Sequence, residues 1–162
     1  RGTKSHPRRK VGKPMEKLHW DTVGPLTPTG IDGSKHFTLA VCDNAGAIFV
    51  RPSLRATSAD ATLLLRSLDI EHPNRIRVCR SDDGSEFRGK FGAALRSMTI
   101  IQERSGPHAH HQNGVAERAV RRVKEGTSCA LIQSGLSVEW RSEAQMCYGA
   151  LLVRQGSGVG VG

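Results

Sequence analysis

The segment LHWDTVGP, residues 18–25, alternates apolar and polar side chains and ends in a glycine–proline pair. A period of two predicts a β-strand, because successive side chains of a strand point to opposite faces of the sheet. Leu18 and Trp20 then share one face, and His19 and Asp21 share the other. An acidic residue within a strand is disfavoured by propensity. Asp21 is therefore either a functional carboxylate or a charge that faces water from an edge strand.

The sequence on the C-terminal side of this strand predicts a sheet with helices. Two β-rich runs are separated by DNAG, which favours a hairpin turn. Helical spacing follows, with Ser58 as a candidate N-cap. The order β-β-β-α-β-α-β-α-α is typical of an α/β fold in which helices flank a mixed sheet. The predicted strands are residues 16–25, 35–42, 47–54, 75–82 and 99–104, and the predicted helices are residues 58–70, 85–98, 113–135 and 138–153.

The two ends of the chain differ in composition from its centre. Residues 1–14 are basic and polar and contain two prolines, which predicts a linker or arm. Residues 154–162 are rich in glycine, which predicts a disordered tail. Residues 15–153 then form one folded domain, long enough to bury a substantial core.

The chain is basic, with 24 lysines and arginines against 15 aspartates and glutamates and a pI near 10. This balance favours a polyanionic partner, nucleic acid first, although a solvated cationic face has the same composition. We find no apolar run of membrane-spanning length and no signal peptide. The cysteines lack zinc-ligand spacing, which predicts reduced, mostly buried thiols in an intracellular protein that is not secreted. They are Cys42, Cys79, Cys129 and Cys147.

The segment RSDDGSEF, residues 80–87, carries two adjacent aspartates before a glycine. Aspartate and glycine are ordinary residues of a solvated turn. They also suit a cation, because Mg²⁺ binds hard oxygen ligands, commonly one or two carboxylates together with water and phosphate. A two-metal site needs further carboxylates from other elements. Asp21 and Glu117 are the candidates that accompany Asp82.

Glu117 lies in the first turn of the long predicted helix. Glu117, Arg121 and Lys124 share one face of this helix, at positions i, i+4 and i+7. Such a face suits a metal and a phosphate bound together. Taken alone, it is better explained as an N-terminal acid with ion pairs on a solvated surface. A stripe of small apolar residues on another face predicts close packing on the sheet, and its members are Val115, Ala116, Ala119, Val120 and Val123.

Together, LHWDTVGP, RSDDGSEF and PHAHHQNGVAER (residues 107–118) resemble the three signature segments of retroviral and retrotransposon integrase catalytic cores. The likeness is greatest to copia-type retrotransposons and extends over about residues 13–154. Between Asp82 and Glu117 lie 34 residues, one fewer than is customary in that family. A single deletion in the intervening loop explains this difference.

The resemblance implies an RNase H-like α/β fold, with a five-stranded mixed sheet flanked by helices on both sides. It implies that Asp21, Asp82 and Glu117 are the catalytic triad and hold two Mg²⁺ or Mn²⁺ ions for in-line displacement. The implied activity is that of a polynucleotidyl transferase and endonuclease that trims the ends of element DNA and joins them to target DNA. The implied partner is double-stranded DNA, bound by a homo-oligomer without membrane contact. The implied compartment is the nucleus or cytoplasmic virus-like particles.

The resemblance also indicates which residues approach DNA, namely the loop before the long helix and the basic residues beyond Glu117. They are Gln112, Asn113, Gly114, Arg118, Arg121 and Lys124. Glycine in such a loop permits close approach of the backbone to a phosphate. His108, His110 and His111 are too close in sequence to converge easily on one tetrahedral zinc ion. Tyr148, the single tyrosine, is interpreted as a core residue rather than a nucleophile.

Two departures from the family leave alternatives open. Asp83 stands where the family has asparagine, which adds negative charge beside Asp82 and removes an amide donor. This change would strengthen metal binding or raise the pKa of a neighbouring acid. The sequence also contains neither the family's histidine–cysteine zinc module nor its C-terminal DNA-binding region. The alternatives to an active integrase are a catalytically silent nucleic-acid-binding or assembly module and another RNase H-like nuclease or transposase.

Overall fold

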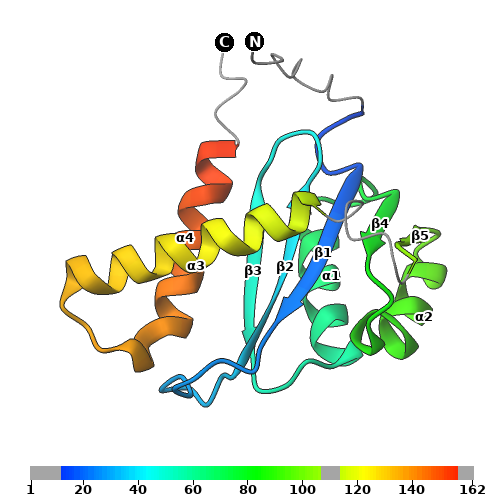
Figure 1. The fold of residues 1–162 in the computed structure, drawn as a ribbon. Coiled ribbons are helices and arrows are strands. Elements are labelled where there is room, and N and C mark those ends of the chain that lie inside the picture. Colours follow the sequence, from blue (N-terminus) through cyan, green and yellow to red (C-terminus); the bar gives the residue numbers. More distant parts are fainter. Residues whose placement is uncertain (1–11, 107–113, 157–162) are drawn as a thin grey trace, which may run out of the picture.

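A five-stranded mixed sheet forms the centre of the computed structural model, which describes residues 12–106 and 114–156. The strand order is β3-β2-β1-β4-β5, with β1 in the middle (Figure 1). β1 runs antiparallel to β2 and parallel to β4, while β3 and β5 form the edges. The strands are β1 Lys17–Val23, β2 His36–Cys42, β3 Ile48–Ser53, β4 Val78–Ser81 and β5 Ile101–Arg104. The predicted RNase H-like α/β class is confirmed.

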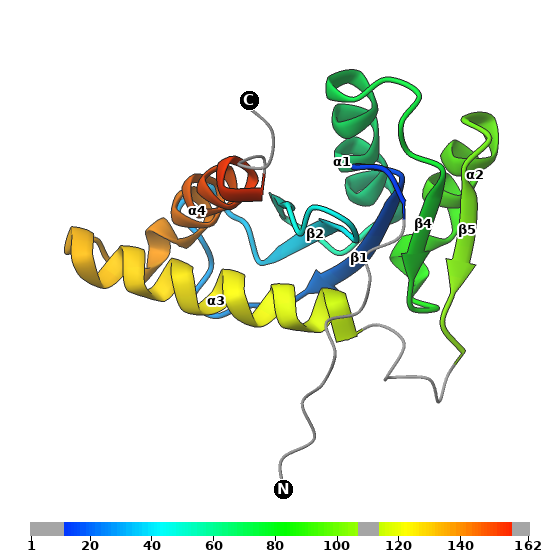
Figure 2. The same ribbon diagram turned by 90° about the horizontal axis from the view of Figure 1, so that it is seen from above.

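Helices cover both faces of this sheet. Apolar side chains of α1 and α2 pack against one face, and those of α3 and α4 pack against the other. Figure 2 shows α1 and α2 on the side of the sheet opposite to α3. The helices are α1 Ser58–Glu71, α2 Gly89–Ser97, α3 Gly114–Ser134 and α4 Arg141–Gly156, with single 3-10 turns at Ser85–Phe87 and Val138–Trp140. In residues 12–106 and 114–156, none of these helices combines the length and apolarity that a membrane span requires.

Trp20 anchors the face of β1 that is covered by α1 and α2. It is fully buried, as is Leu18 two residues earlier. The ring of Trp20 meets Phe91 of α2 edge-on at a centroid distance of 5.0 Å, and Phe91 meets Phe87 at 5.6 Å. The predicted alternation in β1 is therefore confirmed, and it turns Asp21 toward the opposite face.

Small side chains bring α3 close to the other face of the sheet. Ala116, Ala119 and Val123 are buried against Phe37 and Leu39 of β2, which confirms the predicted stripe. Further along α3, Gly126 lies against the ring of Tyr148 on α4, and a Cβ at this glycine would meet ring atoms at 2.0 Å. Tyr148 packs on the same cluster, as the core interpretation predicts.

Several local predictions differ from the structure. The N-cap of α1 is Thr57 rather than Ser58, because the Thr57 side chain accepts from the Asp60 amide at 3.2 Å. The helix predicted over residues 85–98 is a 3-10 turn followed by α2, because Gly89 has a left-handed φ of 47° that interrupts the helix. α4 continues to Gly156, beyond the predicted end at residue 153.

The prediction of mostly buried cysteines holds for the sheet and fails for the helices. Cys42 and Cys79 are buried strand residues, and burial raises the pKa of the Cys79 thiol to about 12. Cys129 and Cys147 are exposed, because they lie on the outer surfaces of α3 and α4.

Candidate active site

Three secondary-structure elements bring the predicted acids to one end of the sheet. Asp21 lies toward the C-terminal end of β1, and Asp82 directly follows β4. β1 and β4 are parallel with His19 opposite Arg80, so Asp21 and Asp82 each lie two residues further along. Glu117 lies in the first turn of α3, whose preceding residue Ala116 is buried against the sheet.

The electrostatics of Asp21 indicate that its carboxylate lies within range of the other acids' charges. Burial is the largest cause that raises the pKa of Asp21, to about 6, and the Thr22 amide opposes it by donating to Oδ1 at 2.8 Å. The negative charges of Asp82, Glu117 and Glu86 raise this pKa further. A carboxylate pKa is raised in this way only by like charges that lie nearby.

Glu86 is a fourth acid near Asp21, outside the triad that the resemblance implies. It is the second residue of the 3-10 turn Ser85–Phe87, and its charge acts on Asp21. Gly84 explains the placement. A Cβ added at Gly84 would lie 2.7 Å from Glu86 Oε2 and 3.0 Å from Asp82 Oδ1, so both carboxylates flank this glycine. The sequence feature that could have indicated this proximity is the position of Glu86, four residues after Asp82 across a glycine turn.

Gly84→Ala is expected to separate these two carboxylates without unfolding the protein. Gly84 has φ −59° and ψ 148°, which alanine adopts freely, so stability should change by less than about 1 kcal/mol. The added methyl group displaces the Glu86 and Asp82 oxygens, and we expect Mn²⁺ affinity to fall by roughly 10-fold. Calorimetric titration with MnCl₂ measures this change. Gly106→Ala is the matched control, because a Cβ there meets no atom within 4 Å. If Gly84→Ala and Gly106→Ala bound Mn²⁺ with equal affinity, Asp82 and Glu86 would not share an ion.

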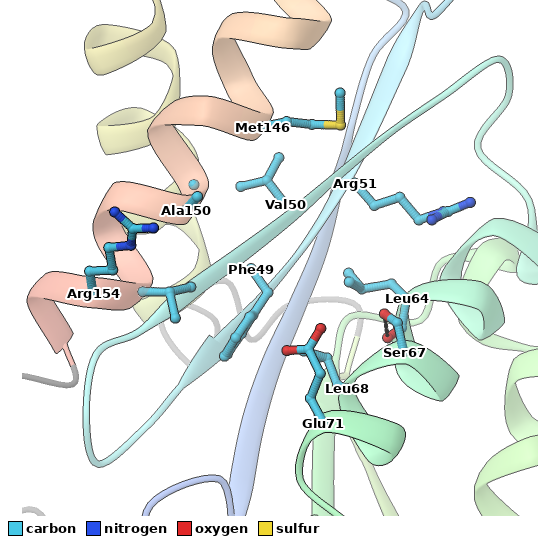
Figure 3. Close-up of a pocket in the computed structure, with 12 residues that line it drawn as sticks. Phe49, Val50, Arg51, Leu64, Ser67, Leu68, Glu71, Met146, Ala150 and Arg154 are labelled. Atoms are coloured by element: carbon cyan, nitrogen blue, oxygen red, sulfur yellow. Dashed lines mark hydrogen bonds between the residues drawn. The ribbon is translucent and has the colours of Figure 1, made fainter.

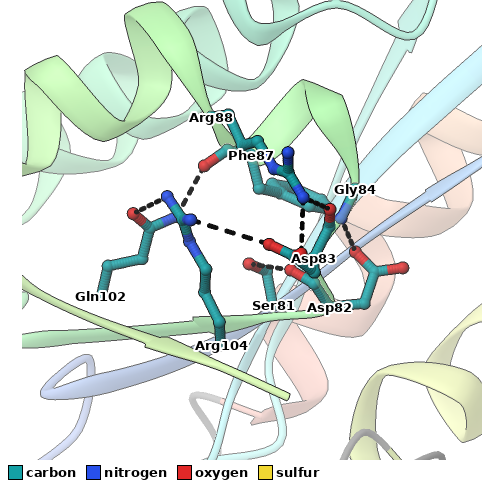
Figure 4. A network of polar contacts seen from close by, with 8 residues as sticks. All are labelled: Ser81, Asp82, Asp83, Gly84, Phe87, Arg88, Gln102 and Arg104. Atoms are coloured by element: carbon teal, nitrogen blue, oxygen red, sulfur yellow. Dashed lines mark hydrogen bonds and ion pairs between the residues drawn. The ribbon is translucent and has the colours of Figure 1, made fainter. Parts of the chain in front are cut away.

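Asp83, the residue next to Asp82, belongs to a separate network. Its carboxylate pairs with Arg88 at 2.5 Å and with Arg104 of β5 at 3.6 Å. Figure 4 shows Asp83 directed toward these arginines, while Asp82 accepts from the Gly84 amide at 3.0 Å. Asp83 is not among the charges that raise the pKa of Asp21. Its charge is therefore compensated by cations, and the predicted effect on a neighbouring acid is not seen at Asp21.

A polar row extends from Asp21 across the face of the sheet. His19 is buried, and its Nε2 lies 3.0 Å from Asp43 Oδ1. Burial lowers the pKa of His19, and the Asp43 hydrogen bond partly opposes this shift. Arg80 lies opposite His19 on β4 and pairs with Glu103 at 3.7 Å. Polar side chains therefore border the acidic site along β1 and β4, whereas the residue paired with Asp21 on β2 is the apolar Leu39.

The structure describes some of the residues that were predicted to contact DNA, and others lie outside the described ranges. Gly114 is the first residue of α3, and Arg118, Arg121 and Lys124 are exposed on that helix. Gln112 and Asn113 lie outside the described residues, as do His108, His110 and His111. The exposed cations of α3 follow Glu117 by one, four and seven residues, so they lead away from the acidic site along the helix.

The donor chemistry of the site suits Mg²⁺ or Mn²⁺, since its candidate ligands are carboxylate oxygens from separate elements. Within the part of the chain that the structure describes, no three His, Cys, Asp or Glu side chains already form a group that holds an ion. The repulsion that raises the pKa of Asp21 is the force that a divalent cation would relieve.

A cavity on another part of the sheet lacks this chemistry. It has a volume of about 470 Å³ and is bounded by β3, α1 and α4 (Figure 3). Its lining is mainly apolar, with Glu71 as its single carboxylate among the residues that line it. Figure 3 shows Met146 and Ala150 of α4 facing Leu64 and Leu68 of α1 across β3. Without a second acid, this cavity does not suit metal-dependent chemistry on phosphates.

Solved structures with a similar fold were found by comparison. The catalytic core domain of BIV integrase matches with a TM-score of 0.63 and 17% identity, over 91% of this chain and 87% of that one. The fold is that of a retroviral integrase catalytic core. A simian T-cell lymphotropic virus intasome, solved with PP2A regulatory subunit B56 gamma, matches this integrase core fold with a TM-score of 0.69 and 18% identity. That alignment covers 90% of this chain and 53% of the other, so the chain spans about half of its length. No family model and no curated protein matches.

Proposed function

We propose that this chain is the catalytic core of a copia-type retroelement integrase. It binds double-stranded DNA as part of a homo-oligomer, trims the ends of element DNA and joins them to target DNA. The structural similarity to solved integrases supports the fold. The amino-acid sequences of the three signature segments support the copia type. The compartment that fits this activity is the nucleus or a cytoplasmic virus-like particle.

One observation carries the proposal. Asp21, Asp82 and Glu117 come from a strand, a bend and a helix that are distant in sequence, yet the charges of Asp82 and Glu117 raise the pKa of Asp21. A solvated surface disperses like charges, because repulsion between neighbouring acids costs stability. Their placement at one end of the sheet is therefore explained by a function that needs several carboxylates together.

The residues have distinct roles in this proposal. Asp21 and Asp82 hold the metal from adjacent parallel strands, and Glu117 closes the site from α3. These three carboxylates would hold Mg²⁺ or Mn²⁺, which would supply activation of water or a DNA 3′-hydroxyl and charge stabilisation at the leaving oxygen. Arg121 and Lys124 lie on the Glu117 face of the helix and bind the phosphates of the DNA end.

Glu117→Gln is expected to reduce metal-dependent nicking and strand transfer by at least about 100-fold, because the amide cannot neutralise a cation. The measurement is cleavage of duplex DNA that carries element ends, in MgCl₂ or MnCl₂. Glu125→Gln is the matched control, since Glu125 is exposed on the same helix. We expect this control to retain wild-type activity. Equal activity in Glu117→Gln and the wild type would overturn the assigned mechanism.

The alternative function is a catalytically silent module that binds nucleic acid or supports assembly. It is favoured by the excess of 24 lysines and arginines over 15 acids, which binding to nucleic acid explains without catalysis. Titration with MnCl₂ separates the two functions. Heat of binding that disappears in Asp82→Asn supports the enzyme, and no binding by the wild type supports the silent module.

A further inference from the structure

A second charged site lies at the opposite end of β1 from the acids. It is a cavity of about 460 Å³ formed where the chain enters two parallel strands. The amides of Arg77 and Val78 both donate to the Glu16 carbonyl, at 2.9 and 3.0 Å, which joins the start of β4 to the start of β1. The residues that line the cavity are Lys13, Pro14, Glu16, Asn74, Arg75 and Arg77.

Several cations near β1, β4 and β5 are already paired with acids. Lys17 and Arg80 pair with Glu103, and Arg88 and Arg104 pair with Asp83. By contrast, the cations of the cavity form no ion pair with any residue in the described ranges. These unpaired cations are Lys13, Arg75 and Arg77.

The single carboxylate of the cavity is already engaged. Glu16 Oε2 accepts a hydrogen bond from the Lys13 amide at 2.8 Å. Three cations therefore border a concave surface with one acid, and Asn74 adds an amide donor. Such a surface is complementary to an anion with several oxygen acceptors, because arginine binds phosphate through two parallel hydrogen bonds.

We propose that this cavity binds the sugar–phosphate backbone of DNA at a position separate from the acidic site. Lys17 and Asp21 are about 13 Å apart along β1 at the usual rise of a strand, and Lys13 lies further away. The inference rests on the proposed function only in taking DNA as the polyanion. A duplex that extends past the acidic end, or a second duplex in an assembly, would reach this cavity.

The lining favours nucleic acid over an acidic protein. Protein interfaces usually have an apolar or aromatic centre. Among the described residues that line this cavity, Pro14 is the one with an apolar side chain. Backbone contacts to phosphate need charge and donors without an apolar centre. Residues 1–11, which precede the cavity residues in the sequence, contain five lysines and arginines and therefore carry further positive charge.

Arg75→Gln with Arg77→Gln tests the proposal. The probe is a random 30-base-pair duplex, and anisotropy measures its affinity for the full chain between 50 and 200 mM KCl. Loss of two phosphate contacts is expected to weaken binding by about 10-fold or more and to reduce the slope of log affinity against log salt by about 2. Arg66→Gln with Arg96→Gln removes the same charge from exposed positions on α1 and α2 and should change affinity less than about 3-fold. Melting temperatures verify that both variants fold.

Three outcomes would overturn the proposal. Equal losses in the two double variants would mean that only net charge matters. Binding of polyglutamate that depends on Arg75 and Arg77, with duplex affinity unchanged, would assign the cavity to an acidic protein. A wild-type chain that binds no duplex would remove both this site and the proposed function. A chain that binds duplex through Arg75 and Arg77 but never nicks it would contradict the proposed activity alone.

Discussion

Asp21→Asn is expected to give a protein that is more stable than the wild type and has only background activity. Activity is lost because the amide cannot hold a cation between β1 and the other acids. Stability rises because the ionised Asp21 is partly buried and faces Asp82, Glu117 and Glu86. Its pKa of about 6, against 3.8 for the ordinary side chain, corresponds to about 1–2 kcal/mol after allowance for solvent screening.

The stability difference between Asp21→Asn and the wild type should depend on pH, because the pKa of Asp21 is raised in the folded state. The folded state holds the Asp21 proton more tightly than the unfolded state, so ionisation of Asp21 destabilises the fold. Below about pH 4 the proton is present in both states, and the wild type has no penalty. Between about pH 4 and 6 the penalty grows, and above pH 6 it is complete. The variant should therefore melt about 3–8 °C higher than the wild type at pH 7.5 and at the same temperature near pH 4.

Thermal melts with and without MnCl₂ complete the test. A ligand that binds only the folded state stabilises it, so Mn²⁺ should raise the melting temperature of the wild type and leave Asp21→Asn unchanged. Asp43→Asn is a useful control, because it removes an acid from the same face outside the cluster. A melting curve of Asp21→Asn below that of the wild type at pH 7.5 would show that the acids do not repel one another.

Trp20→Ala is expected to cost about 3–5 kcal/mol of unfolding free energy, a large part of the total for a domain of this size. Trp20 is fully buried at the centre of the sheet and holds Phe91 of α2 edge-on. Its removal leaves a cavity between β1 and α2 that the rigid sheet cannot fill. Asp21 is the next residue, so activity should fall together with stability.

Urea denaturation measures this loss. Trp140→Ala is the matched control, because Trp140 is 39% exposed in a 3-10 turn and should cost less than about 1 kcal/mol. Trp20→Phe keeps an aromatic contact to Phe91 and should recover a substantial part of the stability. Similar costs for the two tryptophan-to-alanine variants would contradict the central position of Trp20.

The order of elements was predictable because it depends on local periodicity. The alternation of LHWDTVGP gave both the strand and the opposite directions of Trp20 and Asp21, and the small-residue stripe gave the packing face of α3. Helix starts were less predictable. By composition Ser58 is a slightly better cap than Thr57, but Thr57 has the extended backbone that a cap requires.

The side-chain partners within the site were not predictable, because they join residues that are distant in sequence. Nothing near Asp83 indicated that Arg104 of β5 would approach it. The role of Gly84 in holding Glu86 beside Asp82 likewise depends on the exact path of the bend. The cavity of Lys13, Arg75 and Arg77 forms only because β1 and β4 begin side by side.

The network of Asp83, Arg88 and Arg104 has a consequence for sequence divergence. An asparagine at position 83, as in the resembling family, would leave two guanidinium groups without their counter-charge. Replacement of either arginine alone would leave Asp83 paired only with the other one. The effect of a substitution at one of these positions therefore depends on the residues at the other two. Related sequences should exchange the three positions as a set, so that covariation at positions 83, 88 and 104 marks the lineage that carries this arrangement.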